Sequence, residues 1–141
     1  MTTIAYNHKD KQLAVDSRTT CGGIVASDKV NKTREVNGVL FVGTGMTHDI
    51  NQLIDAYPNQ CVDADYGAIV YAIDGGKLFR IGQTATEGWW IDEVTFSRAD
   101  GSGEQFATAA MDFGCSAKDA VKYAMTRDIY TGGKVKVINL K

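Results

Sequence analysis

Short apolar runs separated by polar turns fill the first half of the 141-residue chain, and this pattern predicts β-strands. The Asp-Gly-Gly turn at 74–76 joins two such runs and is typical of a hairpin. Comparable runs follow Trp89-Trp90 and occupy the end of the chain. The predicted strands span residues 2–6, 12–16, 24–25, 39–42, 68–73, 78–81, 94–96 and 135–138.

A helical period first appears between residues 50 and 57. Apolar side chains recur there at i, i+3, i+4 and i+7, which is one face of a helix. Thr47 precedes this face and is the predicted N-cap. Pro58 follows it and is predicted to end the helix, because proline cannot continue the backbone hydrogen bonds.

Two further helices are predicted near the C-terminus. Phe106, Ala110 and Phe113 mark the apolar face of the first, which Gly114 ends. The second begins at the N-cap Ser116, with an aspartate three residues later, and carries Ala, Val and Met at helical spacing up to residue 125.

The order of elements is strands, one helix, strands, two helices and a final strand. This order is typical of an α+β fold in which helices cover sheets. The chain has the length of one ordinary domain and shows neither repeats nor linkers. We therefore expect a single domain over residues 1–141, in which the Trp89-Trp90 pair packs into the core or, as a second interpretation, contacts another subunit.

Composition narrows the class of protein. Hydrophobic residues make up 44% of the chain and charged residues 23%, which excludes a disordered chain. The uninterrupted apolar runs are far shorter than the roughly 18 residues that suggest a membrane span. The net charge is −2, whereas a general nucleic-acid binder normally carries a basic face. We therefore do not expect a nucleic-acid partner.

The metal-binding residue types are few and dispersed. Cys21, Cys61 and Cys115 lack metal-ligand spacing and are interpreted as reduced thiols of a cytoplasmic protein. His8 and His48 lie far apart in the sequence. We expect no metal, no cofactor and no secretion signal at the N-terminus.

The N-terminus itself carries candidate chemistry, because Met1 is followed directly by Thr2-Thr3-Ile4. A threonine hydroxyl is a weak nucleophile until a nearby base takes its proton. A free α-amine, with a pKa of about 7.7–8.0, can be that base at neutral pH. Removal of Met1 would give Thr2 both groups at once.

Other polar residues follow in short motifs. Taken singly, each is more often a surface charge or a turn residue, and their joint order favours a site. They are Asp16 in Val-Asp-Ser-Arg, Lys32 sixteen residues later, Gly45 opening Gly-Met-Thr-His-Asp, Ser102 within Gly-Ser-Gly, and Asp128 and Thr131 within Arg-Asp-Ile-Tyr-Thr-Gly-Gly.

In this order the motifs resemble the peptidase subunits of proteasomes and of their bacterial HslV-type relative, from the first residues to the last strand. The resemblance implies a four-layer αββα N-terminal-nucleophile hydrolase sandwich with two antiparallel sheets. It further implies a threonine peptidase that acts on polypeptides as a cytoplasmic homo-oligomer. Thr2 would be its nucleophile after Met1 is removed.

The resemblance also assigns roles to the remaining motif residues. Lys32 would lower the pKa of the Thr2 amine, and Asp16 would pair with Lys32. The Gly45 N–H would help to form the oxyanion hole. The other assignments are hydrogen bonding around the amine by Ser102, Asp128 and Thr131, and substrate binding by Thr20, Gly43 and Gly45.

The chain departs from this family in one region. Only eighteen residues separate Asp49 from the strand predicted at 68, room for one short helix where the family has two longer ones. One helical layer is therefore predicted to be shortened. Since those helices help to build subunit contacts, the size of the assembly stays open, and Gly43 suggests a wide specificity pocket.

Two other functions stay open at this stage. One is a non-catalytic proteasome-like subunit with a structural or interaction role, and the other is hydrolysis of a small amide. An ATP-dependent unfoldase would be a separate protein, because the sequence contains no G-x-x-x-x-G-K-[ST] motif.

Overall fold

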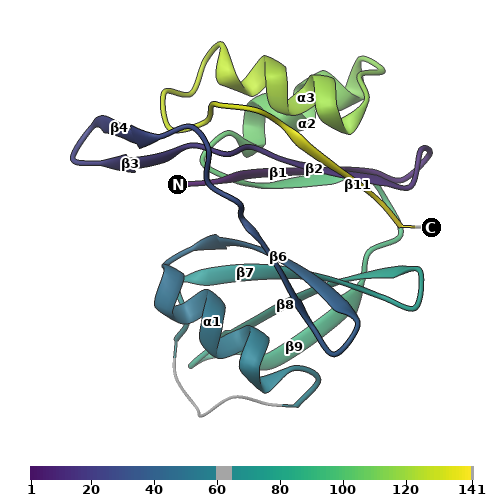
Figure 1. Ribbon diagram of the computed structural model, residues 1–141. Helices are drawn as coiled ribbons and strands as arrows, with labels where there is room; N and C mark the ends of the chain where they lie inside the picture. Colours follow the sequence, from purple (N-terminus) through teal and green to yellow (C-terminus); the bar gives the residue numbers. More distant parts are fainter. Residues whose placement is uncertain (60–64, 141) are drawn as a thin grey trace. The chain divides into compact units, whose positions relative to one another are not determined.

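The computed structural model describes residues 1–59 and 65–140 and shows an α+β fold. Its strands form a four-stranded, a two-stranded and a five-stranded sheet, and three helices accompany them within the described residues (Figure 1). The chain divides into two compact units, one of Met1–Lys32 with Thr95–Lys141 and the other of Thr33–Val94. The single domain and the four-layer arrangement therefore stay predictions.

The first unit is built on an antiparallel sheet with the strand order β10-β1-β2-β11. Strand β1 lies inside this sheet, and Thr3 pairs with Gly101 on one side while Ile4 pairs with Val15 on the other. The strands are β1 (Thr3–Asn7), β2 (Gln12–Val15), β10 (Arg98–Gly101) and β11 (Lys136–Asn139).

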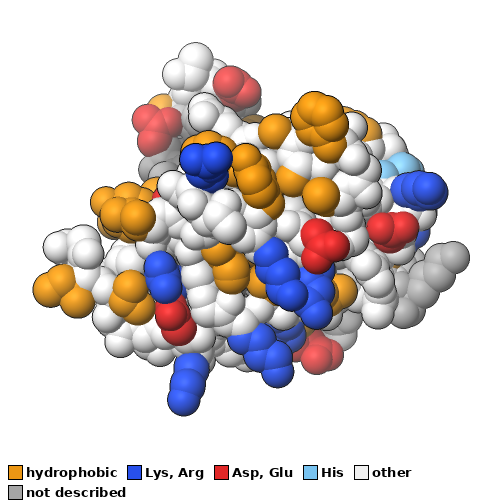
Figure 2. Space-filling model, turned by 90° about the horizontal axis from the view of Figure 1, so that it is seen from above, with side chains coloured by type: hydrophobic (Ala, Val, Ile, Leu, Met, Phe, Trp, Pro, Cys, Tyr) orange, Lys and Arg blue, Asp and Glu red, His pale blue; other side chains and the backbone are white. Residues whose placement is uncertain are grey.

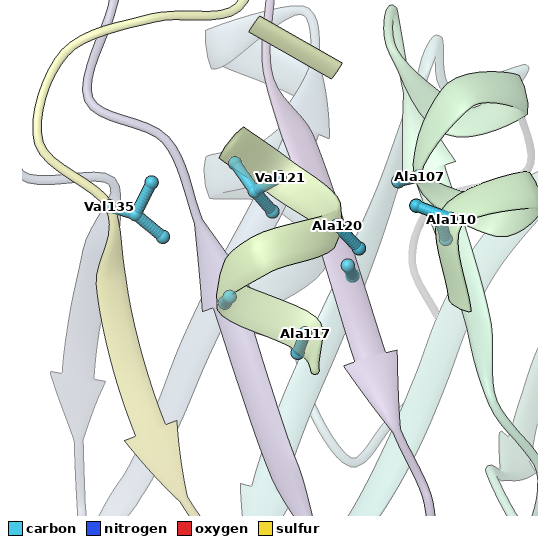
Figure 3. Packing of buried hydrophobic residues seen from close by; sticks show 9 residues of the cluster. Ala107, Ala110, Ala117, Ala120, Val121 and Val135 are labelled. Atoms are coloured by element: carbon cyan, nitrogen blue, oxygen red, sulfur yellow. The ribbon is translucent and has the colours of Figure 1, made fainter. Parts of the chain in front are cut away.

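Helices α2 (Glu104–Asp112) and α3 (Ala117–Met125) cover one face of this sheet (Figure 1). Small side chains let the helices approach the sheet and each other closely. Ser116 caps α3 as predicted, since its side chain accepts a hydrogen bond from the Asp119 N–H. The buried cluster shown in Figure 3 includes Ala107, Ala110, Ala117, Ala120, Val121 and Val135.

Strands β3 (Thr19–Cys21) and β4 (Ile24–Ser27) form the separate two-stranded hairpin of the first unit. The connecting residues Gly22 and Gly23 both have positive φ, a conformation that glycine adopts without steric cost. Ile24 is 71% exposed at this hairpin. Figure 2, seen from the side of α2 and α3, shows apolar side chains interspersed with basic and acidic ones.

The second unit is a five-stranded antiparallel sheet in the order β5-β6-β7-β8-β9, with helix α1 (Thr47–Ala56) packed against β6 and β7 (Figure 1). Its core includes Phe41, Leu53, Val70 and Ile81. The strands are β5 (Thr33–Val36), β6 (Val39–Gly45), β7 (Ala68–Asp74), β8 (Lys77–Thr84) and β9 (Gly88–Glu93).

Three local predictions are wrong. Met46 occupies the N-cap position of α1 without a side-chain hydrogen bond, so Thr47 is the first helical residue and not the cap. Phe113 is the C-cap of α2 and is 93% exposed, because Ala107 and Ala110 form the buried face of that helix.

The third wrong prediction is the strand at 94–96, where the backbone is irregular. Strands β9 and β10 flank this segment but belong to different sheets, and the boundary between the two units falls at Val94. Its first residue, Val94, still donates its N–H to the Leu78 carbonyl at 2.8 Å, and the chain then leaves this sheet before β10 begins. Trp89 belongs to β9 and packs against the core of the second unit, which confirms the predicted core role for this member of the Trp89-Trp90 pair.

Two further predictions concern the cysteines and membrane spans. Cys21 and Cys115 are free thiols, and Cys61 lies outside the described residues. None of the helices in the described part of the chain is long and apolar enough to cross a membrane.

Candidate active site

The N-terminal segment lies against the end of strand β10. The Thr2 carbonyl accepts a hydrogen bond of 3.0 Å from the Ser102 N–H, and Thr2 is only 8% exposed. Gly101 has a φ of +111°, and a Cβ atom at this position would lie 1.7 Å from the Thr2 carbonyl oxygen. Glycine at 101 is therefore what allows residue 2 to lie this close to β10.

Asp16 and Lys32 form a buried ion pair next to this segment. The Lys32 Nζ donates to Asp16 Oδ1 at 2.9 Å and to the Met1 carbonyl oxygen at 2.9 Å. The exposed fraction of the side chain is 9% for Lys32 and 0% for Asp16. Lys32 is thus held at the carbonyl of the peptide bond between Met1 and Thr2.

The Asp16 carboxylate has further donors that fix its position at the end of β2. Its Oδ1 accepts the Thr3 N–H at 3.1 Å, and its Oδ2 accepts the Gly132 N–H at 3.1 Å. A buried carboxylate is stable only when its lone pairs are satisfied in this way. Asp16 therefore joins β1, Lys32 and the loop before β11.

Burial lowers the pKa of the Lys32 ammonium, and this effect exceeds the opposing effect of the ion pair with Asp16. A positive charge held at this point would lower the pKa of a second amine placed beside it.

Asp128 and Thr131 belong to one turn at the end of α3. Asp128 Oδ2 accepts the Thr131 hydroxyl proton at 2.5 Å, and Asp128 Oδ1 accepts the Tyr130 N–H at 3.1 Å. The Thr131 N–H closes the turn by donating to the Asp128 carbonyl at 3.1 Å. Asp128 and Thr131 are therefore three residues apart because they are the first and last residues of a turn whose hydrogen bonds end on the Asp128 carboxylate and carbonyl.

The electrostatic surroundings of Asp128 connect it with the N-terminus. Burial raises the pKa of Asp128, but the hydroxyls of Ser102 and Thr131 and the Tyr130 N–H outweigh it, so the pKa is lowered. The positive α-amine of the chain adds to this lowering. Ser102 Oγ is buried, and among the described residues it has no hydrogen-bond partner of ordinary geometry.

Thr3 is a site residue that the sequence interpretation missed. Its side chain is fully buried, and its Oγ1 lies 2.7 Å from Thr131 Oγ1 and accepts the Gly103 N–H at 2.9 Å. The available signal was strand alternation, which turns the Thr3 side chain to the face opposite to that of Thr2.

The structure brings most of the predicted site residues into the first unit, in contact with or close to the N-terminal segment. These residues are Thr2, Asp16, Lys32, Ser102, Asp128 and Thr131. Thr20 also belongs to this unit and lies half-buried in β3 opposite Val25. Its predicted contact with substrate stays a prediction.

Gly43 and Gly45 belong to the second unit, at the end of β6. Gly45 has a φ of +117°, and a Cβ there would lie 2.2 Å from the Gly67 carbonyl oxygen. A Cβ at Gly43 would lie 2.6 Å from the Ile50 side chain, so α1 fills the space beside it. Close packing thus explains why glycine occupies both positions. Their roles in the oxyanion hole and in substrate binding stay predictions.

Metal-binding residue types are not gathered in the part of the chain that the structure describes. Within it, no group of three or more His, Cys, Asp and Glu side chains is placed to hold a metal ion.

The chain resembles known proteins in its three-dimensional structure and not detectably in its sequence. At the level of sequence, no protein-family model and no curated protein matches the chain. The solved structure of eukaryotic HslV from Trypanosoma brucei aligns with a TM-score of 0.70 at 21% identity and covers 98% of both chains.

Two structures of BPH from Thiobacillus denitrificans align comparably. The complex with epoxomicin has a TM-score of 0.70 at 19% identity and full coverage of both chains. BPH alone has a TM-score of 0.68 at 18% identity and covers 99% of this chain and 98% of its own. The chain therefore has an HslV- and proteasome-β-subunit-like fold, which confirms at the level of fold the resemblance that its motifs predicted.

Proposed function

We propose that the chain is a threonine-type peptidase in which Thr2 becomes the N-terminal nucleophile once Met1 is removed. One observation carries the proposal: the side chain of Lys32, paired with Asp16, lies 2.9 Å from the carbonyl oxygen of residue 1. Lys32 donates to the carbonyl of Met1, and Asp128 interacts electrostatically with its α-amine. A structural role alone gives no reason to place a lysine of lowered pKa at this peptide bond.

Removal of Met1 changes two groups at the same time. The nitrogen of Thr2 is an amide while Met1 is attached, and an amide cannot take a proton from a hydroxyl at neutral pH. Hydrolysis of this bond turns it into an α-amine with an ordinary pKa of about 7.7–8.0. It also removes the carbonyl that Lys32 binds, so that the Lys32 ammonium is left beside the new amine.

The reaction then follows the chemistry of an acyl transfer. The Thr2 amine takes the hydroxyl proton while Thr2 Oγ1 attacks the peptide carbonyl, and the resulting oxyanion needs an N–H donor, the role that the family resemblance assigns to Gly45. The ammonium returns the proton to the leaving amine, which leaves an ester on Thr2. Water, deprotonated by the same amine, hydrolyses the ester and regenerates Thr2.

The charged residues act before this step. A positive charge on Lys32 disfavours a second positive charge on the amine and keeps it a free base. Asp16 holds Lys32 in place, and Asp128, Thr131 and Ser102 provide the polar surroundings of the amine. Lys32, Asp16 and the Asp128–Thr131 turn are thus proposed to set the protonation state of one nitrogen.

The test compares two chains of identical sequence from Thr2 onward. One retains Met1, and the other is released from a cleavable N-terminal fusion so that it begins at Thr2, with intact mass confirming both. We expect peptide hydrolysis only by the chain that begins at Thr2, and none by its Thr2→Ala variant. A correctly processed, folded chain without activity would favour a non-catalytic subunit.

Substrate and assembly are part of the same proposal. We expect polypeptide substrates, and a small-amide series assayed beside them separates the two kinds of hydrolase. We also expect a homo-oligomer, whose size light scattering after size exclusion measures directly. A separate ATP-dependent unfoldase stays a prediction, tested by whether folded proteins are degraded only when such a motor is added.

A further inference from the structure

Thr3 binds both halves of the candidate site at once. Its backbone exchanges two hydrogen bonds with Asp16, the Thr3 N–H donating to Oδ1 at 3.1 Å and the Asp16 N–H donating to the Thr3 carbonyl at 3.4 Å. Its hydroxyl lies 2.7 Å from the Thr131 hydroxyl. Thr3 is the residue next to the proposed nucleophile, and its side chain is completely buried.

Counting protons settles the direction of the side-chain hydrogen bonds. An ionised Asp128 carboxylate can only accept, so the single hydroxyl proton of Thr131 is donated to Asp128. The hydrogen bond between the two threonines must then be donated by Thr3. The remaining partner, the Gly103 N–H, donates to Thr3 Oγ1 at 2.9 Å.

The result is a one-way chain of donors. It runs from the Gly103 amide at the start of α2, through the hydroxyls of Thr3 and Thr131, to the Asp128 carboxylate. Hydrogen bonds in such a chain polarise one another, so each strengthens the next. Valine has nearly the same shape as threonine but would interrupt the chain in the middle.

We propose that Thr3 is a positioning residue for the peptidase reaction, holding Thr2 between the Lys32–Asp16 pair and the Asp128–Thr131 turn. The role rests on the proposed function, because it matters only if Thr2 reacts. The backbone of Thr3 fixes the position of Thr2 relative to Asp16. The hydroxyl of Thr3 fixes the position of Thr2 relative to Asp128. Small errors in such positioning cost about 10²-fold in rate.

The experiment uses chains that begin at Thr2 and carry Thr3→Val, Thr3→Ser or the control Thr108→Val. The control makes the same hydroxyl-to-methyl change on the exposed face of α2. The rate of covalent labelling of Thr2 by a peptidyl epoxyketone is measured against pH for each chain. The Asp128 carboxyl is titrated by carbon NMR on the same samples, independently of any activity.

We expect Thr3→Val to label about 10²-fold more slowly, with a displaced pH profile and a raised Asp128 pKa. Thr3→Ser keeps the hydroxyl and should retain the wild-type profile, as should Thr108→Val. A merely structural role would give parallel pH profiles. If Thr3→Val does not fold, Thr3→Cys keeps the size with a weaker donor and should also label more slowly.

The two claims fail in different ways. Wild-type chain that begins at Thr2, is folded and is not labelled would refute the proposed function. The positioning role alone would be refuted by a different result. In that case the wild-type chain is labelled, and the Thr3→Val or Thr3→Cys chain is labelled at the same rate across the pH range.

Discussion

Replacing Asp16 by asparagine removes one charge from the buried pair and leaves the other in place. Lys32 would keep its ammonium in a side chain that is 9% exposed, without the carboxylate 2.9 Å away. The amide introduced at position 16 could accept from Lys32 or from Gly132 but would present N–H groups to the other donor. The substitution therefore combines an uncompensated buried charge with a lost acceptor.

The expected cost follows from these two losses. Breaking a buried ion pair by removing one partner costs about 3–5 kcal/mol. Since domains of this size have a total stability of about 5–15 kcal/mol, Asp16→Asn should remain folded but with a much lower margin. The corresponding fall in midpoint temperature is on the order of 10 °C.

Calorimetry and urea unfolding measure the effect, and Asp28→Asn is the matched control. Asp28 forms an ion pair with Arg18 at 2.8 Å, but its side chain is 41% exposed. Water screens this pair, so a far smaller loss is expected. In a double variant, Lys32→Met should recover part of the stability lost in Asp16→Asn, because it removes the unpaired charge.

The loss should also depend on pH with a definite sign. Burial already lowers the pKa of Lys32 below its ordinary 10.5, and loss of Asp16 lowers it further. The unfolded chain then binds the proton more tightly than the folded chain, so stability rises with pH until 10.5 is passed. Equal losses in Asp16→Asn and Asp28→Asn, or no relief at high pH, would refute a buried, charge-dependent pair.

Three further predictions use other features of the first and second units. Gly101→Ala should abolish activity and lower the free energy of unfolding in urea by several kcal/mol, because its Cβ would lie 1.7 Å from the Thr2 carbonyl oxygen. The control Gly75→Ala, at φ +60° with open space around it, should cost only about 1–2 kcal/mol. Ser116→Ala should lower the free energy of unfolding by about 1 kcal/mol through loss of the α3 cap, with activity unchanged. The lowered pKa of Asp128 stabilises the fold above pH 3.8, and this contribution should be lost as the pH falls below that value; an Asp128→Asn variant whose acid unfolding curve coincides with wild type would contradict it.

The elements that the sequence predicted well are those in which local signals agree. Helix α3 has a capping serine, an aspartate at the third position and an apolar face, and the structure contains all three. Strands β5 and β10 lack such signals, because Thr-Arg-Glu-Val and Arg-Ala-Asp-Gly show little alternation and are defined by the strands beside them. Their pairing is a property of the sheet, which sequence periodicity does not contain.

The candidate site divides in a similar way. The Asp16–Lys32 pair was anticipated because spacing and resemblance agreed on it. The hydrogen bond from Thr131 to Asp128 was not, because both residues were expected to bond around the N-terminal amine. Thr3 was missed because its importance lies in which atoms its hydroxyl reaches, and these come from segments about 100 residues or more away. Gly43 suggested a wide pocket, but the position of Ile50 beside it depends on the packing of α1.

The central claim is that Thr2, freed of Met1, is the reacting residue. The most direct measurement is mass spectrometry of the chain that begins at Thr2 after incubation with epoxomicin, an epoxyketone that reacts with a hydroxyl and the adjacent free amine. The account predicts one adduct per chain, located on Thr2, and none on Thr2→Ala or on the chain that keeps Met1. A folded chain with a free Thr2 that stays unmodified, or an adduct on another residue, would contradict it.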